Sequence, residues 1–319
     1  MAIGRLIAGS LALAFGACAQ APPAELPVAL GGGWMLDPPG WLDAAKVACP
    51  PAGWDRDALV AAKAAGFEIA DNEKRQAFAK AITDCLASPD PELRDGIAYE
   101  GLAHMLRAKQ LSDETKQALL ADLVARLDAP AGAGFEQPFA ALALSEVARA
   151  DRVEAFLSED ELIKLLVDAQ HWFINVSDYR GFDEREGWRH GVAHGADLLM
   201  QLALNPRIDA EGLRLIVSAV GAQVAPEGHA YVFGESERLA RPVLFAAARG
   251  AMDQAKWSEW LMVMATPPEG IASQGTAWLA WRHDAAAFLQ ALYVGAKLGA
   301  DAGDDVLLPG LEAALKAMP

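Results

Sequence analysis

Cysteine is scarce in this sequence: Cys18, Cys49 and Cys85 are the only three among 319 residues. So few thiols, so far apart, exclude a disulfide-rich scaffold and a cysteine-based zinc site. Positive charge is also scarce, with 27 Lys and Arg against 43 Asp and Glu and a formal net charge of −16. Because an acidic surface repels phosphate backbones, we expect no nucleic acid as a partner.

Long hydrophobic runs are missing except at the start of the chain. The run "LIAGSLALAFGA" follows Arg5 and is soon ended by Pro22 and Pro23. It is too short to span a bilayer and is typical of an export signal. We therefore expect residues 1–19 to be a signal peptide or lipoprotein leader, and the mature protein to be periplasmic or anchored to the outer membrane.

Two cleavage sites fit this leader. The string "AFGAC" is similar to a bacterial lipobox, in which Cys18 would be acylated, although Phe15 stands where leucine is usual. Alternatively, Ala17 and Ala19 give the small-x-small pattern of ordinary signal peptidase cleavage. Contact with the membrane is expected only through such an N-terminal lipid anchor.

Export leaves Cys49 and Cys85 as the two remaining thiols. In an oxidising compartment this pair can form a disulfide, and closing the loop between them would stabilise the fold by about 4 kcal/mol. The alternative is two unpaired buried thiols.

Alternation with period two, the mark of a strand, is missing throughout. Apolar residues instead recur at spacings of three and four, as in 112–129 and 158–173, which predicts helices. Asp90 before Pro91 predicts one helix start, and Ser158 with Glu161 forms a capping box at another.

These patterns predict an all-α fold of stacked antiparallel helix pairs, a HEAT-like α-α superhelix, with an α/α toroid as the alternative. We expect residues 20–54 to be an irregular N-terminal segment. Residues 55–319 are expected to form a single helical-repeat domain.

The stretch "EGWRHGVAHGADLL", residues 186–199, carries the most distinctive polar pattern. On a helix over residues 187–200, His190, His194 and Asp197 would share a stripe about 60° wide. Glycines 187, 191 and 195 would lie beside it, which indicates that a neighbouring helix or a ligand approaches the backbone closely.

Four interpretations of this stripe stay open. His190, His194 and Asp197 could form a buried polar network, or could hold a divalent metal; no other cofactor is indicated. They could also work with Glu235 as acid–base catalytic residues, or line a ligand pocket. The H-E-x-x-H motif of metalloproteases is absent, because Gly191 follows the first histidine.

Two flanking clusters could complete a site. The loop before the motif combines charge with aromatic residues, and long ordered loops are often functional. A second such cluster is "YVFGESERLARP". We expect its carboxylates to pair with the histidines and its arginines with the loop aspartates. Together the two clusters provide the ligand-binding candidates Asp178, Arg180, Asp183, Trp188, Tyr231 and Arg238.

A resemblance is visible at these residues. The strings "GWRHGVAHGADLL", "DYRG" and "FGESERLARPV" resemble an uncharacterised bacterial family, number 2785 among the domains of unknown function. The resemblance covers roughly residues 55–300 and implies a mostly helical domain without an established reaction.

We therefore expect an exported helical-repeat protein of unknown activity, a binding or scaffold protein of the cell envelope. Its partner would be a peptide, a protein or a small molecule, received on a surface centred on the His190/His194 helix. The alternative is a metal-dependent or acid–base hydrolase centred on His190, His194 and Asp197.

Overall fold

The computed structural model describes residues 49–319. The predicted leader, Cys18 and most of the predicted irregular segment lie outside these residues. The described part is helical, with one two-stranded ribbon. Its elements are α1 (Arg56–Ala64), α2 (Asn72–Ala81), η1 (Ile82–Ala87), η2 (Glu92–Tyr99), α3 (Glu100–Arg107), α4 (Asp113–Leu127), α5 (Glu136–Val153), α6 (Glu159–Ile174), β1 (Phe182–Asp183), β2 (Gly187–Trp188), α7 (Gly191–Leu204), α8 (Ala210–Ala222), α9 (Glu235–Ala248), α10 (Gln254–Met264), α11 (Thr276–Leu298), η3 (Asp304–Leu307) and α12 (Leu308–Ala317).

Helix starts follow the capping signals of the sequence. Six helices begin after an Asp or Ser whose side chain accepts a hydrogen bond from a backbone N–H group of the first turn. The capping box of Ser158 and Glu161 is present at α6. Asp90 accepts a hydrogen bond from the Glu92 N–H at 2.9 Å, so the predicted start at Pro91 is also confirmed.

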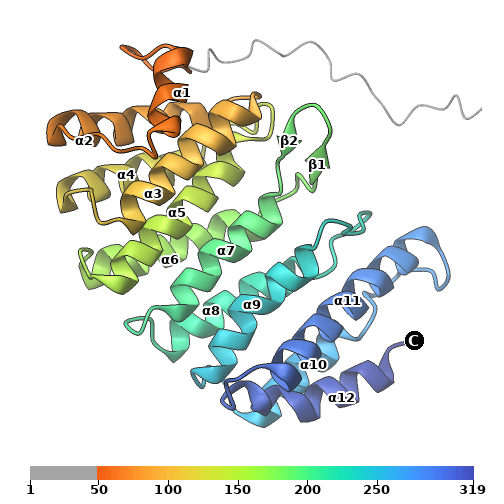
Figure 1. Cartoon of the computed structure of the whole chain (residues 1–319). Coiled ribbons are helices and arrows are strands. Elements are labelled where there is room, and N and C mark those ends of the chain that lie inside the picture. Colours follow the sequence, from red (N-terminus) through yellow and green to blue (C-terminus); the bar gives the residue numbers. More distant parts are fainter. Residues whose placement is uncertain (1–48) are drawn as a thin grey trace, which may run out of the picture. The chain divides into compact units, whose positions relative to one another are not determined.

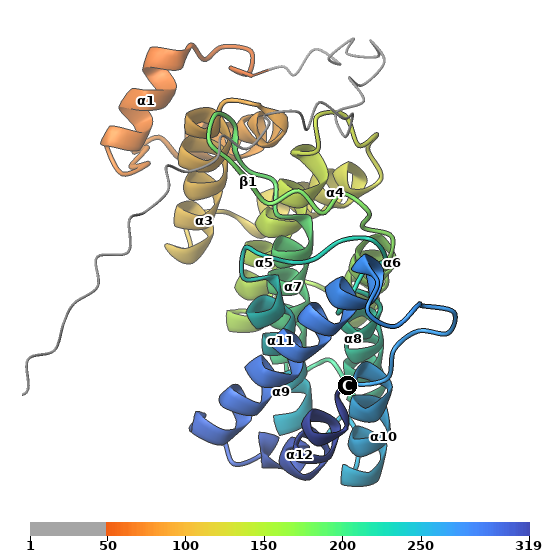
Figure 2. The same ribbon diagram turned by 90° about the vertical axis from the view of Figure 1, so that its right-hand side faces the viewer.

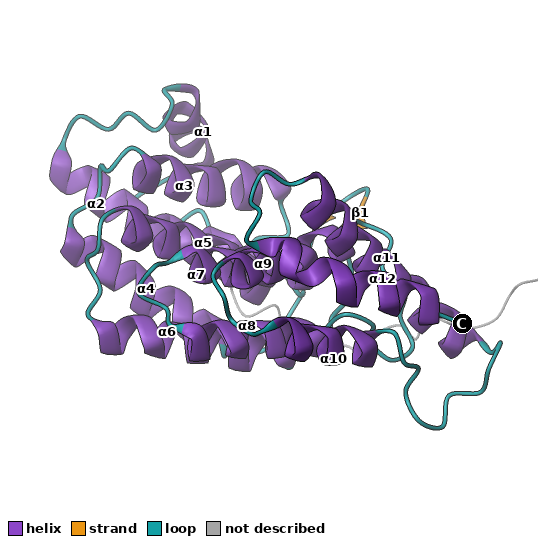
Figure 3. Ribbon diagram, turned by 90° about the horizontal axis from the view of Figure 1, so that it is seen from below, coloured by secondary structure: helices purple, strands orange, loops and turns teal. Residues whose placement is uncertain are grey.

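The helices form two layers, which Figure 3 shows edge-on. One layer contains α3, α5, α7, α9 and α11, and the other contains α2, α4, α6, α8 and α10. Within the first layer α5 packs on α7, α7 on α9 and α9 on α11. Figure 2 views the array from the side of α10, α11 and α12. This arrangement confirms the predicted all-α fold of stacked helix pairs.

One hydrophobic core runs through the whole array, from Leu59 on α1 to Ala314 on α12. Helices α1 and α12 lie at opposite ends of residues 49–319, so this part of the chain is an open array and not a closed toroid (Figure 1). No helix among the described residues is both long and apolar enough to cross a membrane.

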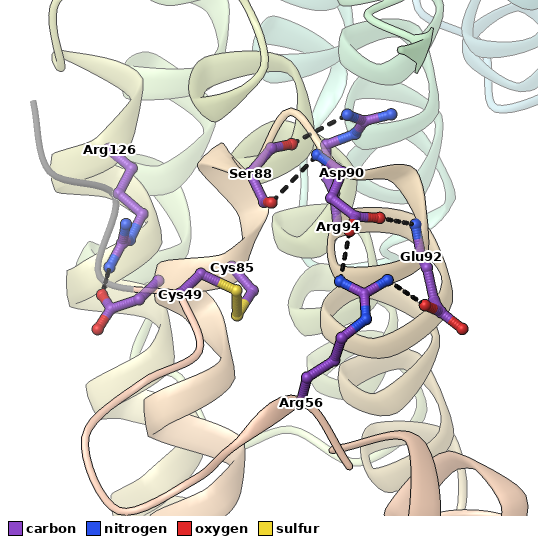
Figure 4. Close-up of a disulfide and its surroundings, with 9 residues drawn as sticks. Cys49, Arg56, Cys85, Ser88, Asp90, Glu92, Arg94 and Arg126 are labelled. Atoms are coloured by element: carbon purple, nitrogen blue, oxygen red, sulfur yellow. Dashed lines mark hydrogen bonds and ion pairs between the residues drawn. A yellow bond between two sulfur atoms is a disulfide. The ribbon is translucent and has the colours of Figure 1, made fainter. Parts of the chain in front are cut away.

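A disulfide fastens the first helices together. Cys49 and Cys85 are bonded, with their Cα atoms 4.9 Å apart, and the bond joins the start of the described chain to η1 (Figure 4). Close by, Arg56 of α1 forms ion pairs with Asp90 and Glu92. These contacts tie α1 to the start of the η2–α3 helix.

Candidate functional site

Helix α7 begins at Gly191, so the predicted helix over residues 187–200 is wrong in its first turn. Gly187 has a φ of +75° and belongs to a tight β-ribbon, where Trp188 pairs with Phe182. The N–H groups of the next two residues donate to loop carbonyls, Arg189 to Gly181 at 2.9 Å and His190 to Arg180 at 3.0 Å. His190 ends the ribbon in the left-handed conformation with φ 56°, which a right-handed α-helix cannot include, so α7 starts only after it.

His190 contacts Glu235 at the base of the ribbon. Its Nε2 atom lies 3.3 Å from Glu235 Oε1, and both side chains are buried. Burial raises the pKa of Glu235, but the contact with His190 and backbone N–H groups outweigh it, so the pKa lies below its ordinary value. The predicted pairing of a carboxylate from the second cluster with a histidine is therefore present.

His194 and Asp197 face other partners. The His194 ring meets the edge of Phe139 on α5, with centroids 4.9 Å apart. Burial, and next the nearby His190, lower the pKa of His194 to about 3, so the ring is neutral at pH 7. Asp197 forms an ion pair with Arg238 of α9, so this arginine does not reach the loop aspartates as predicted.

The three residues proposed as metal ligands are not gathered around one point. His190 is directed to Glu235, His194 to Phe139 and Asp197 to Arg238. Within residues 49–319 no group of three or more His, Cys, Asp or Glu side chains is arranged to hold a metal ion.

A neighbouring helix explains the glycine at position 195. A Cβ atom there would lie 2.3 Å from Cδ2 of the buried Phe173 on α6, and 2.9 Å from Trp172. At Gly191 a Cβ would meet only ordinary contacts, the nearest at 3.5 Å. The close approach inferred from the sequence is therefore made by α6 at Gly195.

The ribbon is clamped onto the array by two arginines. Arg94 of η2 and Arg189 each place a guanidinium 4.2 Å from the centre of the Phe135 ring. Arg94 is fully buried and donates to the Glu186 carbonyl at 2.8 Å, while Arg189 donates to the Ala133 carbonyl at 2.9 Å. These cation–π and hydrogen-bond contacts fix the position of the ribbon.

The other loop candidates also have structural partners. Asp178 and Arg180 form an ion pair, and Arg180 donates to the Ala133 carbonyl at 3.3 Å. Asp183 accepts hydrogen bonds from the N–H groups of Arg185 and Glu186 and so shapes the turn of the ribbon. Among the described residues, no ion pair or side-chain hydrogen bond joins these three to the His190–Glu235 pair, and Arg180 reaches His190 only through its backbone carbonyl.

Residues 231–235 are held by side chains from two helices. The buried carboxylate of Asp284 on α11 accepts a hydrogen bond from the Tyr231 N–H at 2.9 Å. The Tyr231 hydroxyl donates to the Gln223 carbonyl at 2.9 Å. Glu235 accepts a hydrogen bond from the Phe233 N–H at 2.9 Å. Asp284 was not predicted, although an aspartate within the apolar stretch "DAAAFLQAL" was a usable signal.

Three aromatic side chains meet on the surface beside Glu235 and Asp284, and the exposed Val232 precedes one of them, Phe233, in the chain. Phe182, Trp188, Val232 and Phe233 are 47%, 36%, 71% and 40% exposed. The Trp188 ring lies 5.0 Å from the Phe182 ring and 5.8 Å from the Phe233 ring. We call these four residues the hairpin patch. Sequence reasoning placed Trp188 among the ligand-binding candidates but did not predict that the other three join it.

The residues below the hairpin patch are in direct contact with it. The His190 ring stacks under Trp188, with centroids 4.7 Å apart and planes 20° from parallel. Phe233 lies against Gly181, where a Cβ atom would be 2.0 Å from the phenyl ring. The polar residues that stand out in the sequence thus carry an exposed apolar surface.

The space beside His190 and Glu235 is narrow. The gap bounded by Tyr179, His190, Tyr231 and Glu235 leaves no room for a water molecule. A substrate therefore cannot reach the His190–Glu235 contact in this conformation.

A comparison with protein families gives one match. The model described as "Protein of unknown function (DUF2785)" matches residues 123–294, a range that contains the ribbon, α7 and α9. No curated protein and no solved structure matches the chain significantly.

Proposed function

The chain belongs to the family of proteins of unknown function DUF2785, and from this premise we propose that it is a binding or scaffold protein of the cell envelope, which holds a polypeptide partner on the hairpin patch. The observation that carries the proposal is the meeting of three exposed aromatic side chains, Phe182, Trp188 and Phe233, from two segments far apart in the chain. Val232, the residue before Phe233, is also exposed.

Exposed aromatic side chains of this kind suit a protein interface. Clustered apolar surface is uncommon on monomeric proteins and marks sites of interaction. Trp and Phe are enriched where partners meet, and Trp residues often carry most of the binding energy. Trp188 stands at the centre of the patch, between Phe182 and Phe233.

The buried contacts below the patch support binding further. Glu235 and Asp284 hold the backbone of residues 231–233, and His190 supports the Trp188 ring from beneath. A surface that is already ordered loses less conformational entropy when a partner binds. The buried carboxylates of Glu235 and Asp284 would therefore keep the exposed apolar side chains in place.

The hydrolase alternative has less support from the geometry. His190 and Glu235 form a carboxylate–imidazole contact, but the adjoining space is too narrow for water. A general base must come within hydrogen-bond reach of the proton that it removes. Binding on the open surface needs no such access.

The location in the envelope is supported by the chain's chemistry. The disulfide between Cys49 and Cys85 suits an oxidising compartment. The apolar run near the chain start is typical of an export signal.

Site-specific photo-crosslinking in the cells that make the protein tests the proposal. A photoreactive residue at Val232 should give a discrete adduct, and the adduct should be lost in the double variant Trp188→Ser, Phe233→Ser. The same residue at Leu298, which is 79% exposed at the end of α11, is the matched control and should give no such adduct. Equal adducts at both positions, or an adduct that survives the double variant, would contradict the proposal.

A further inference from the structure

A cleft of about 400 Å³ lies away from the hairpin patch, where α3 and α5 end and α4 begins. Its apolar wall contains Leu106, Leu111 and Ala150. Four basic side chains line it: Arg107, Lys109, Lys116 and Arg149. This concentration of positive charge is unexpected in a chain with a formal net charge of −16.

Three of these four basic groups are paired with carboxylates. Arg107 donates to the buried Glu146 at 2.8 Å. Lys109 pairs with Glu154 at 2.9 Å, and Lys116 pairs with Asp113 at 2.7 Å. In the two lysine pairs the carboxylates are well exposed, and such pairs contribute little and rearrange easily.

Arg149 and the adjacent Arg152 are different. Neither forms an ion pair with any residue that the structure describes; Arg152 donates only to the amide oxygen of Gln201, at 3.1 and 3.3 Å. Burial, and next the charge of Arg149, lower the pKa of Arg152. Of the two, only Arg149 lines the cleft, so it leaves the cleft with one uncompensated positive charge, and the nearby Arg152 adds to the positive potential.

We propose that this cleft is a binding site for a phosphate monoester, with Arg149 as its principal contact. A guanidinium presents a planar fork of donors that matches phosphate oxygens, and a monoester carries between one and a half and two negative charges at pH 7. The Lys116 ammonium group lies 4.3 Å from the centre of the Phe156 ring. When the phosphate binds, it would replace the Asp113 carboxylate as the ion-pair partner of Lys116.

Isothermal titration calorimetry of the disulfide-bonded mature protein with glycerol phosphate tests the site. We expect saturable binding that weakens as salt is raised, and a dissociation constant about tenfold higher for Arg149→Gln. The matched control is Arg214→Gln on α8, which removes the same charge far from the cleft and should bind like the wild type. Lys116→Gln, which removes another basic group that lines the cleft, provides a second variant if Arg149→Gln fails to fold by its melting temperature.

Vesicles separate a lipid headgroup from a soluble ligand. Sedimentation with phosphatidylcholine vesicles that contain phosphatidic acid, lost in Arg149→Gln, would assign the site to a lipid phosphate. Binding of glycerol phosphate without sedimentation would assign it to a soluble monoester. The proposal is overturned if glycerol phosphate shows no saturable binding at low salt, or if Arg149→Gln and Arg214→Gln bind it equally.

Discussion

Replacing Asp284 by asparagine should make the protein more stable at neutral pH. The Asp284 carboxyl is fully buried on α11, accepts one hydrogen bond from the Tyr231 N–H, and has an Oδ2 atom without a partner among the described residues. Burial, to which the nearby Glu235 adds, raises its pKa to about 6 against the opposing effect of the Tyr231 hydrogen bond. At pH 7 the folded protein therefore carries a charge that is poorly solvated.

The size and sign of the effect follow from this pKa. Raising it from 3.8 to about 6 corresponds to about 3 kcal/mol, because the folded state binds the proton more tightly than the unfolded state. The wild type keeps this stabilisation below about pH 4 and loses it as the pH rises through about 6. Asparagine keeps the acceptor for Tyr231 and removes the charge, but it adds an N–H group that needs a partner, so we expect a net gain of about 2 kcal/mol at pH 7.

Urea unfolding followed by circular dichroism, between about pH 4 and pH 8, measures this gain. Asp284→Asn should exceed the wild type in free energy of unfolding at pH 7, and the difference should shrink as the pH falls and change sign at about pH 4, where the wild type has regained its stabilisation. Asp57→Asn is the control, because Asp57 is exposed on α1. A loss of stability at pH 7, or a difference that does not change with pH, would refute the reasoning.

Three further predictions concern the packing and charge around the site. Gly195→Ala should lower the free energy of unfolding by about 1–3 kcal/mol in urea melts, because its Cβ would overlap the buried Phe173, whereas Gly191→Ala should be close to neutral. Glu235→Gln should lower the free energy of unfolding by about 1–3 kcal/mol at pH 7. Because the pKa of Glu235 is lowered in the folded state, this loss should shrink as the pH falls and the carboxylate of the wild type is protonated. A loss that does not depend on pH would count against an ionised Glu235. Cys85→Ser should cost up to about 4 kcal/mol, and a reductant should destabilise the wild type equally while leaving the variant unchanged.

The fold could be read from the sequence to a large extent. The helices follow from apolar spacing, and their starts follow from local signals such as Ser158 with Glu161, because these depend on residues within one turn. The choice between an open array and a toroid could not be read, because it depends on which helices meet across the layers.

The site was predictable only in its composition. The sequence identified His190 and Glu235 as candidate site residues. It predicted a helix through Gly187, however, where the structure has a turn with positive φ. Strands of two residues are too short to leave a periodic pattern. The role of Asp284 depends on a backbone group 53 positions away, at Tyr231, and no local rule reports such a contact.

The central claim is that the hairpin patch binds a polypeptide partner, and the pair Gly181→Ala and Gly191→Ala tests it most directly. A Cβ at Gly181 would lie 2.0 Å from Phe233 and must push this exposed ring out of the hairpin patch, while a Cβ at Gly191 meets only ordinary contacts. In photo-crosslinking from Val232, the account predicts that Gly181→Ala loses the adduct with little change in melting temperature and that Gly191→Ala keeps it. An adduct of equal yield in both variants would contradict the account.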